Sequence, residues 1–442
     1  MKFTIALSGL LTALLASVQS HAQNAPAPPA FSVVYAFTGG ADGEIIEGQE
    51  DLAVDRKGNI YGTGFGPIQN PDCFSIGCGI VFKIDPKGKE STLHSFAGPP
   101  DGNNPLAGVS SDNWGNVYGT TEGGGNNAVA NELGGFGTVF KIEPDGHESV
   151  LYSFTNPPDG GEPNFGEGLI LGKNGDVYGT TDGGGIQSPC LGCGTVFKVT
   201  PDGRETVLYR FLGGTADGWE PTGNLAQDEE GNLYGVTTYG GTYNQGTIYK
   251  VDPRGNETIL YNFTGGFDGW AAQGLIRDCD GTLYGVAKFG GSAPSYSGYG
   301  VAFKLDPKGA FSVLHTFTNG SDGGNPIGQL VRIGTDLYGA TYSGGDQTDI
   351  NCGGEGCGVA YKLDSKGNET VLYTFTGFGD GDNPISGLVQ DWEGNLYGLT
   401  SFGGDLASPS PICAGFGCGV VYKLSPAHKH WDNNAEVGTG KQ

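Results

Sequence analysis

Two tryptophans stand directly after an Asp-Gly pair, Trp219 after Asp217 and Trp270 after Asp268. Exposed aromatic rings beside carboxylates suit a carbohydrate, because the rings stack on sugar faces and the acids accept hydrogen bonds from hydroxyls. The same rings could instead fill the space beside short loops, and the residue types leave both interpretations open. The aromatic residues of the neighbouring loops that would complete a glycan-binding patch are Tyr239, Tyr243, Tyr296 and Tyr299.

The Asp-Gly pair itself recurs seven times along the chain. Seven carboxylates on one face of a fold could bind calcium or a cationic ligand. Alternatively, each aspartate caps a tight turn with its side-chain oxygen, and the glycine that follows takes up the turn. Recurrence without exception favours the turn, because binding sites tend to break a repeat, so calcium is only an alternative and no other cofactor is expected. The aspartates are Asp42, Asp101, Asp159, Asp217, Asp268, Asp322 and Asp380.

Eight of the nine cysteines form closely spaced pairs, each ending directly before a glycine. In an exported protein this spacing predicts disulfides. A redox motif at residues 190–193 lacks the expected βαβ setting, and zinc would require pairs from distant loops to meet. Cys279 is left as a free thiol. The predicted disulfides join Cys73 to Cys78, Cys190 to Cys193, Cys352 to Cys357, and Cys413 to Cys418.

Catalytic groups are difficult to assemble from the remaining residues. The sequence suggests no Ser-His-Asp set and no histidine cluster for a metal. His94 and His315 occupy a position that other repeats fill with tyrosine, so both are predicted to be structural. Carboxylates alone can act on a polysaccharide, which keeps a lyase or hydrolase open as an alternative.

The elements that position these residues come from a tandem repeat. A motif that ends in Tyr-Gly, most often as Gly-Asn-x-Tyr-Gly, recurs at intervals of 50 to 60 residues, a period typical of propellers and solenoids. Each repeat holds four short apolar segments separated by turn residues, without helical periodicity, which predicts four antiparallel strands. The motif tyrosines are Tyr61, Tyr118, Tyr178, Tyr234, Tyr284, Tyr338 and Tyr397.

The two ends of the repeat region predict a closed ring. Residues 31–37 match a fourth strand, and residues 419–424 match a third strand. Pairing them completes the last blade and removes two exposed sheet edges. The sequence therefore predicts an all-β, seven-bladed β-propeller over residues 31–425, with four antiparallel strands per blade and the N-terminal strand completing the last blade.

This layout defines two faces. The upper face carries the loops between second and third strands and the links between blades, and the lower face carries the short turns between the other strands. Upper loops vary in length, and variable loops on a rigid scaffold commonly carry function. Lysines of the third strands, such as Lys83 and Lys141, are expected to pair across the hairpin with Glu90 and Glu148.

The N-terminus indicates export. A basic start, an apolar run over residues 5–18 and a small-x-small site predict a signal peptide over residues 1–22, followed by an extended leader over 23–30. Residues 426–442 are expected to form a flexible polar tail. The net charge of −25 disfavours nucleic acid and anionic membrane surfaces as partners, and no segment predicts membrane insertion. A periplasmic or extracellular monomer is expected.

The repeat resembles the GloVer tandem-repeat family of exported bacterial proteins. The residues that carry the resemblance are Gly231 to Thr237, Gly394 to Thr400, the Gly-Gly pairs that follow and the Gly-x-Val-Phe/Tyr-Lys segments. The resemblance covers nearly all of the predicted mature chain and implies export and a repeat fold. It implies no established reaction.

Three functions are compatible with the sequence. The first is an exported, non-catalytic propeller that acts as a binding or scaffold module, for an extracellular glycan or an envelope protein, through the upper face near blades 4 and 5. The second is a carboxylate-based polysaccharide lyase or hydrolase on the upper face. The third is a structural envelope or matrix protein.

Overall fold

The computed structural model describes residues 29–45, 51–66, 77–126, 134–155, 157–163, 168–185, 192–292, 298–349, 352–408 and 413–425. The predicted signal peptide, most of the leader and the polar tail lie outside these residues. Within them, the named elements of regular structure are all β-strands. No helix in this part of the chain has the length and apolar character to cross a membrane.

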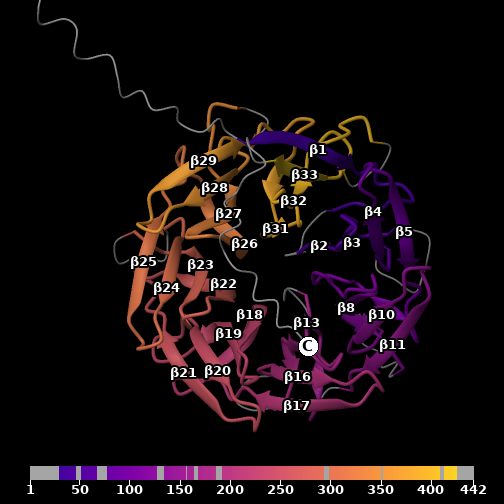
Figure 1. Ribbon diagram of the computed structural model, residues 1–442, viewed down its shortest axis with the longest axis vertical. Coiled ribbons are helices and arrows are strands. Elements are labelled where there is room, and N and C mark those ends of the chain that lie inside the picture. Colours follow the sequence, from indigo (N-terminus) through magenta and orange to yellow (C-terminus); the bar gives the residue numbers. More distant parts are fainter. Residues whose placement is uncertain are drawn as a thin grey trace, which may run out of the picture.

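Seven antiparallel sheets are arranged as blades around a common centre, as predicted (Figure 1). Blade 1 contains β2 (Ala53–Val54), β3 (Ile60–Gly64), β4 (Ile80–Ile84) and β5 (Glu90–Ser95). Blade 2 contains β7 (Ser110–Ser111), β8 (Val117–Thr121), β10 (Thr138–Ile142) and β11 (Glu148–Ser153). Blade 3 contains β13 (Ile170–Leu171), β14 (Val177–Thr181), β16 (Thr195–Val199) and β17 (Glu205–Arg210). Short two-stranded sheets accompany blades 2 and 3: β6 (Gly102–Asn103) with β9 (Gly123–Gly124), and β12 (Gly160–Gly161) with β15 (Gly183–Gly184).

The inner strands are longer in the next three blades. Blade 4 contains β18 (Gly218–Gln227), β19 (Leu233–Gly240), β20 (Thr247–Val251) and β21 (Glu257–Asn262). Blade 5 contains β22 (Trp270–Arg277), β23 (Leu283–Phe289), β24 (Val301–Leu305) and β25 (Phe311–Thr316). Blade 6 contains β26 (Gly324–Ile333), β27 (Asp336–Ser343), β28 (Val359–Leu363) and β29 (Glu369–Thr374). Blade 7 contains β30 (Asp382–Pro384), β31 (Val389–Gln390), β32 (Leu396–Phe402), β33 (Val420–Ser425) and β1 (Ala30–Ala36).

The N-terminal strand β1 closes the ring. It pairs with β33, with Phe31 opposite Leu424 and Ala36 opposite Val420. Beside it, the backbone N–H of Phe37 donates to the carbonyl of Gly419 over 3.0 Å. The predicted closure is confirmed, and the outer edge of β33 is covered by β1 (Figure 1).

The repeated Tyr-Gly pair has a structural role in the second strand. The Tyr61 hydroxyl donates to Asp55 over 3.0 Å and fixes the turn that precedes it, and three further blades repeat this contact. The glycine makes room for an aromatic ring of the third strand, because a Cβ on Gly119 would lie 2.5 Å from Cζ of Phe140. The motif is therefore an element of turn and core packing.

Every Asp-Gly link forms a capped turn. In all seven links the aspartate accepts the backbone N–H of a residue four or five positions earlier. A tyrosine of the preceding fourth strand also donates to the aspartate in five links. His94 and His315 take the place of this tyrosine, 3.1 Å from Asp101 and 3.6 Å from Asp322. These contacts confirm the turn interpretation and the structural role of both histidines.

The predicted lysine–glutamate pairing is wrong. Lys141 lies opposite Ser149, and Glu148 lies opposite Ile142. A register one residue away from the predicted one puts lysine and glutamate on different faces of the sheet, since side chains alternate along a strand. The Lys141 ammonium instead lies 3.1 Å from Glu143.

The hydrophobic core is divided among the gaps between neighbouring blades. Between blades 5 and 6, for example, Val286 and Ala302 pack against Leu330 and Leu337, and all four side chains are buried. Because each blade depends on its neighbours for burial, the ring holds its inner strands at fixed positions around the axis.

Candidate functional site

The two predicted tryptophans each stack on an aromatic partner in the adjoining strand. Trp219 lies opposite Tyr239 in the β18–β19 pair, with ring centroids 4.7 Å apart. Trp270 lies opposite Phe289 in the β22–β23 pair, also at 4.7 Å. Both tryptophans are half-buried. Cross-strand stacking thus covers one face of each indole ring. Sequence reasoning did not identify Phe289 as a stacking partner.

The other residues of the predicted glycan-binding patch differ in how exposed they are. Asp217 and Asp268 are buried in their turns, where each accepts hydrogen bonds from a tyrosine and from the backbone. The Tyr243 side chain is 57% exposed and that of Tyr299 is 41% exposed. Tyr296 lies outside the described residues. The glycan-binding patch of the upper face stays a prediction, with its tryptophans and two of its tyrosines accessible at the surface.

The cysteines form disulfides. Cys352 is bonded to Cys357 and Cys413 to Cys418, as predicted. Cys78 and Cys193 are also disulfide-bonded, and their predicted partners, Cys73 and Cys190, lie outside the described residues. Glu44 and Asp382 approach the two complete disulfides, but oxidised sulfurs are not the thiolate ligands that zinc needs. The Cys279 thiol is free and exposed.

The most distinct break in the repeat lies on the propeller axis. Each blade has a buried leucine or valine in or just before its inner strand, and the residue directly before it is glycine in four blades and polar in three. Close packing requires glycine in two of these blades, because a Cβ on Gly108 would lie 2.7 Å from the backbone nitrogen of Asp51, and a Cβ on Gly387 would lie 2.5 Å from that of Gln329. The seven residues are Asp51, Gly108, Gly168, Asn224, Gly274, Gln329 and Gly387.

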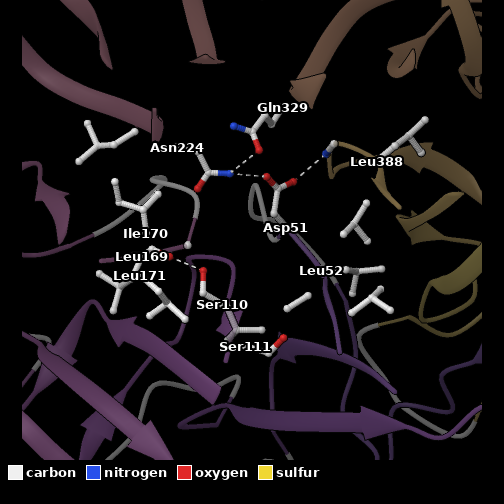
Figure 2. Close-up of a pocket in the computed structure, with 17 residues that line it drawn as sticks. Asp51, Leu52, Ser110, Ser111, Leu169, Ile170, Leu171, Asn224, Gln329 and Leu388 are labelled. Atoms are coloured by element: carbon white, nitrogen blue, oxygen red, sulfur yellow. Dashed lines mark hydrogen bonds between the residues drawn. The ribbon is translucent and has the colours of Figure 1, made fainter. Parts of the chain in front are cut away.

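The three polar side chains form a hydrogen-bonded layer across the centre (Figure 2). The Asn224 amide nitrogen donates to Asp51 Oδ2 over 3.0 Å and to Gln329 Oε1 over 3.2 Å. The backbone N–H of Gly387 donates to Asp51 Oδ1 over 2.8 Å. Gln329 Nε2 donates to the Leu275 carbonyl over 2.9 Å. Five blades therefore meet in one network whose only ionisable group is Asp51.

Burial raises the pKa of Asp51 to about 7, even though the Gly387 and Asn224 hydrogen bonds act in the opposite direction. The carboxyl is surrounded by protein, and water reaches it only partly. Desolvation disfavours the charged form, and the two hydrogen bonds do not replace the lost water. A carboxyl that changes charge near neutral pH at the end of a pocket is a candidate binding or proton-transfer group.

A pocket of about 400 Å³ extends along the axis from this layer. Its walls include Leu52, Val109, Leu169 and Leu388, and Ser110 and Ser111 also line it (Figure 2). The Ser110 hydroxyl donates to the Leu169 carbonyl. The Asn224 Oδ1 atom points away from the Asp51 contact, and no hydrogen bond to it occurs within the described residues. The volume is within the usual range of small-molecule sites.

A second group of acids lies on the upper side of blades 2 to 4. Burial, then the charges of Glu220, Glu122 and Glu162, raises the pKa of Asp182 well above its ordinary value. Glu162 and Glu220 both have a left-handed backbone, with φ of 53°. Non-glycine residues seldom take this conformation. Sequence reasoning expected acids on this face but did not identify these four.

The axial layer was missed because the sequence was searched for chemistry in its loops. Asp51 stands just before β2, and Asn224 and Gln329 stand within β18 and β26, where an isolated polar residue looks like variation of the repeat. Alignment of the seven inner strands would have shown three polar residues at a position otherwise held by glycine. Their convergence depends on closure of the ring, which brings residues up to 278 positions apart to one axis.

The fold agrees with that of several solved structures. The extracellular domain of the hybrid two component system BT3049 from B. thetaiotaomicron matches with a TM-score of 0.54 and 13% identity, covering 90% of this chain and 41% of that chain. The extracellular domain of BT4673 from the same organism gives 0.51 and 13%, covering 91% and 43%. The gluconolactonase XC5397 from Xanthomonas campestris gives 0.42 and 16%, covering 71% and 87%. This chain thus spans less than half of the two B. thetaiotaomicron chains, and the likeness to those two shows the fold alone.

Sequence comparison is more specific. No curated protein is similar enough to count as a relative. The model of the Gloeobacter/Verrucomicrobia repeat matches residues 72–295 and 258–437, which together are well over half of the chain. The matched residues contain six of the seven Tyr-Gly motifs. The chain therefore belongs to the Gloeobacter/Verrucomicrobia repeat family.

Proposed function

We propose that the protein is an exported, non-catalytic binding module that holds the end of a neutral glycan in the axial pocket. The observation that carries this proposal is the Asp51 carboxyl, whose hydrogen bonds to other described residues come only from neutral groups and which lies at the end of an aliphatic pocket. A carboxyl that water reaches only partly is costly for the fold, and a ligand that donates hydrogen bonds to it reduces that cost.

The chemistry of the pocket fits a polyol better than an ion. Asp51 and Asn224 Oδ1 accept hydrogen bonds from hydroxyls, and the leucine and valine side chains contact the C–H groups of a sugar ring. Acidic ligands are disfavoured beside Asp51 and by the net charge of −25. The predicted signal peptide and the disulfides support export, since disulfides persist in oxidising compartments.

Titration calorimetry of the mature protein with neutral monosaccharides tests this proposal. Asp51→Asn keeps the size of the side chain but removes its charge and one acceptor oxygen. Loss of a hydrogen bond to a charged acceptor is worth about 1.5 to 3 kcal/mol, so affinity is expected to fall by about tenfold or more. Asp252→Asn, in an exposed turn, is the matched control. Equal affinity for Asp51→Asn and the parent protein would refute the proposal. Absence of sugar binding would favour a structural envelope or matrix protein.

The predicted patch on the upper face is a second contact surface within the same proposal. Trp219→Ala and Trp270→Ala in the same titrations test it, because loss of a stacking ring weakens a sugar contact but leaves the axial pocket intact. Both variants also remove a cross-strand pair, so their melting temperatures must be measured together with affinity.

A polysaccharide lyase or hydrolase is the second candidate function. Asp182 favours it, because burial and the charges of three neighbouring glutamates raise its pKa and so favour the protonated carboxyl that a general acid needs. Release of reducing or unsaturated sugar ends, abolished by Asp182→Asn, would support catalysis. Polysaccharide that stays intact over long incubation with the folded protein would count against it.

A further inference from the structure

The lower face has a second cavity, of about 720 Å³, between the inner turns of blades 2 and 3. Asn113 and Trp114 line it from blade 2, and Lys173 and Asn174 line it from blade 3. We call this cavity the Trp114 groove. All four residues are exposed, so the groove is open to a ligand from solvent.

The Trp114 groove is continuous with the axial pocket. Ser111, at the end of β7, and Leu171, at the end of β13, line both cavities. A ligand whose end reaches Asp51 therefore leaves the axis over these two residues and enters the groove. A single sugar ring fills only the axial part, whereas a chain extends outward between the blades.

The Trp114 indole is positioned so that a ligand can stack on it. It is 77% exposed, and within the described residues it takes part in no ring contact or side-chain hydrogen bond. The turn itself needs only the Trp114 backbone N–H, which donates to Asp112 over 2.9 Å. The corresponding residues of other inner turns are polar, including Lys57, Glu230 and Glu393. Folding therefore does not explain an indole at this position.

The groove is polar but has no strong net charge. Asp112 is already engaged, since it accepts from the Trp114 and Asn116 backbones and from the Asn116 and Tyr118 side chains. Lys141 lies beside Glu143. The groups left to meet a ligand are two exposed amides and the Lys173 ammonium, which suit hydroxyls, together with a ring that suits the C–H face of a sugar.

We infer that the ligand is an extended neutral glycan whose chain leaves the axial pocket through the Trp114 groove and stacks on Trp114. This inference rests on the proposed function, because it takes the axial pocket as the site of the chain end. It adds the direction of the chain, between blades 2 and 3, and a length of more than one sugar residue.

Titration of the mature protein with neutral gluco-, xylo-, manno- and galacto-oligosaccharides of one to six residues tests the inference. Affinity is expected to rise with length for the recognised series. Trp114→Ala should lower the affinity for the long members by about tenfold and leave that for the monosaccharide unchanged. Trp114→Tyr should restore most of the loss. Trp392→Ala is the matched control, because Trp392 is 73% exposed on the corresponding turn of blade 7 but lines neither cavity.

The outcomes separate the two proposals. Affinity that is independent of length, or that Trp114→Ala and Trp392→Ala lower equally, overturns the groove and leaves the axial site standing. If Asp51→Asn has no effect while Trp114→Ala weakens binding, the axial proposal fails and the chain end lies elsewhere. Failure of every oligosaccharide to bind the folded protein overturns both.

Discussion

The charge of Glu257, on the outer strand of blade 4, should reduce the stability of the fold as pH rises from acidic to neutral. It begins β21, and within the described residues its Oε1 atom is buried without a hydrogen-bond partner. Burial, then the charge of Asp217, raises the pKa of Glu257 from 4.5 to about 7. Glu205 and Glu369 occupy the same position in blades 3 and 6, and burial together with a nearby aspartate likewise raises the pKa of each to about 7.

The direction follows from proton binding. Below pH 4.5 both the folded and the unfolded chain hold the proton on Glu257, and the group does not affect stability. As pH rises toward 7, the unfolded chain loses the proton while the folded chain keeps it. The free energy of unfolding therefore falls through this interval and levels off above pH 7. A pKa difference of this size corresponds to about 3 kcal/mol, and partial exposure of the carboxyl reduces it to about 1 to 2 kcal/mol.

The perturbation is Glu257→Gln, which keeps the shape and removes the charge. Urea unfolding followed by fluorescence should show the variant about 1 to 2 kcal/mol more stable than the parent at pH 8, and equal to it at pH 4. Glu393→Gln, in an exposed turn, is the control and should change little at either pH. An increase of equal size at both pH values would refute the electrostatic explanation, because an effect of packing alone does not depend on the charge of residue 257.

The remaining predictions concern the glycine of the Tyr-Gly motif and the closing strand β1. Gly119→Ala should lower the free energy of unfolding by about 1 to 3 kcal/mol, because the new Cβ would overlap the Phe140 ring. Gly379→Ala is the control, since a Cβ there would have no atom within 4 Å. Equal melting temperatures for Gly119→Ala and the parent protein would contradict this reasoning. Deletion of residues 30–36 should uncover the edge of β33 and cause self-association, visible as a larger species in size-exclusion chromatography with light scattering. A stable monomeric product would show that β1 is dispensable for closure.

The fold could be predicted nearly completely, and the physical reason is repetition. Seven copies of one strand and turn pattern report the same local preferences seven times, so an ambiguous segment in one blade is clear in another. The complementary ends, residues 31–37 and 419–424, add the single long-range pairing that the repeat needs, and β1 and β33 confirm it. The capped Asp-Gly turns follow equally well from local chemistry, because each aspartate bonds to residues only a few positions away.

Register was the first property that local chemistry did not decide. A shift of one residue separates the predicted contact of Lys141 with Glu148 from the observed opposition of Lys141 and Ser149. Turn composition fits both registers, so the residues of the hairpin do not by themselves choose between them. The environment of the outer-strand glutamates, and therefore their pKa, follows from the register.

The candidate site could not be predicted from the sequence, and the reason is different. The tryptophans of blades 4 and 5 were recognisable because they are unusual at their position in the repeat, whereas Asp51, Asn224 and Gln329 are ordinary polar residues in or beside inner strands. Their hydrogen bonds connect blades 1, 4 and 6, and the Trp114 groove depends equally on which turns lie side by side. The sequence by itself thus determined the strands, the turns, the number of blades and the closure, because each depends on neighbouring residues or on repetition. Only the tertiary structure decided which side chains share the axis and what they can bind, since ring closure alone brings them together and removes their water.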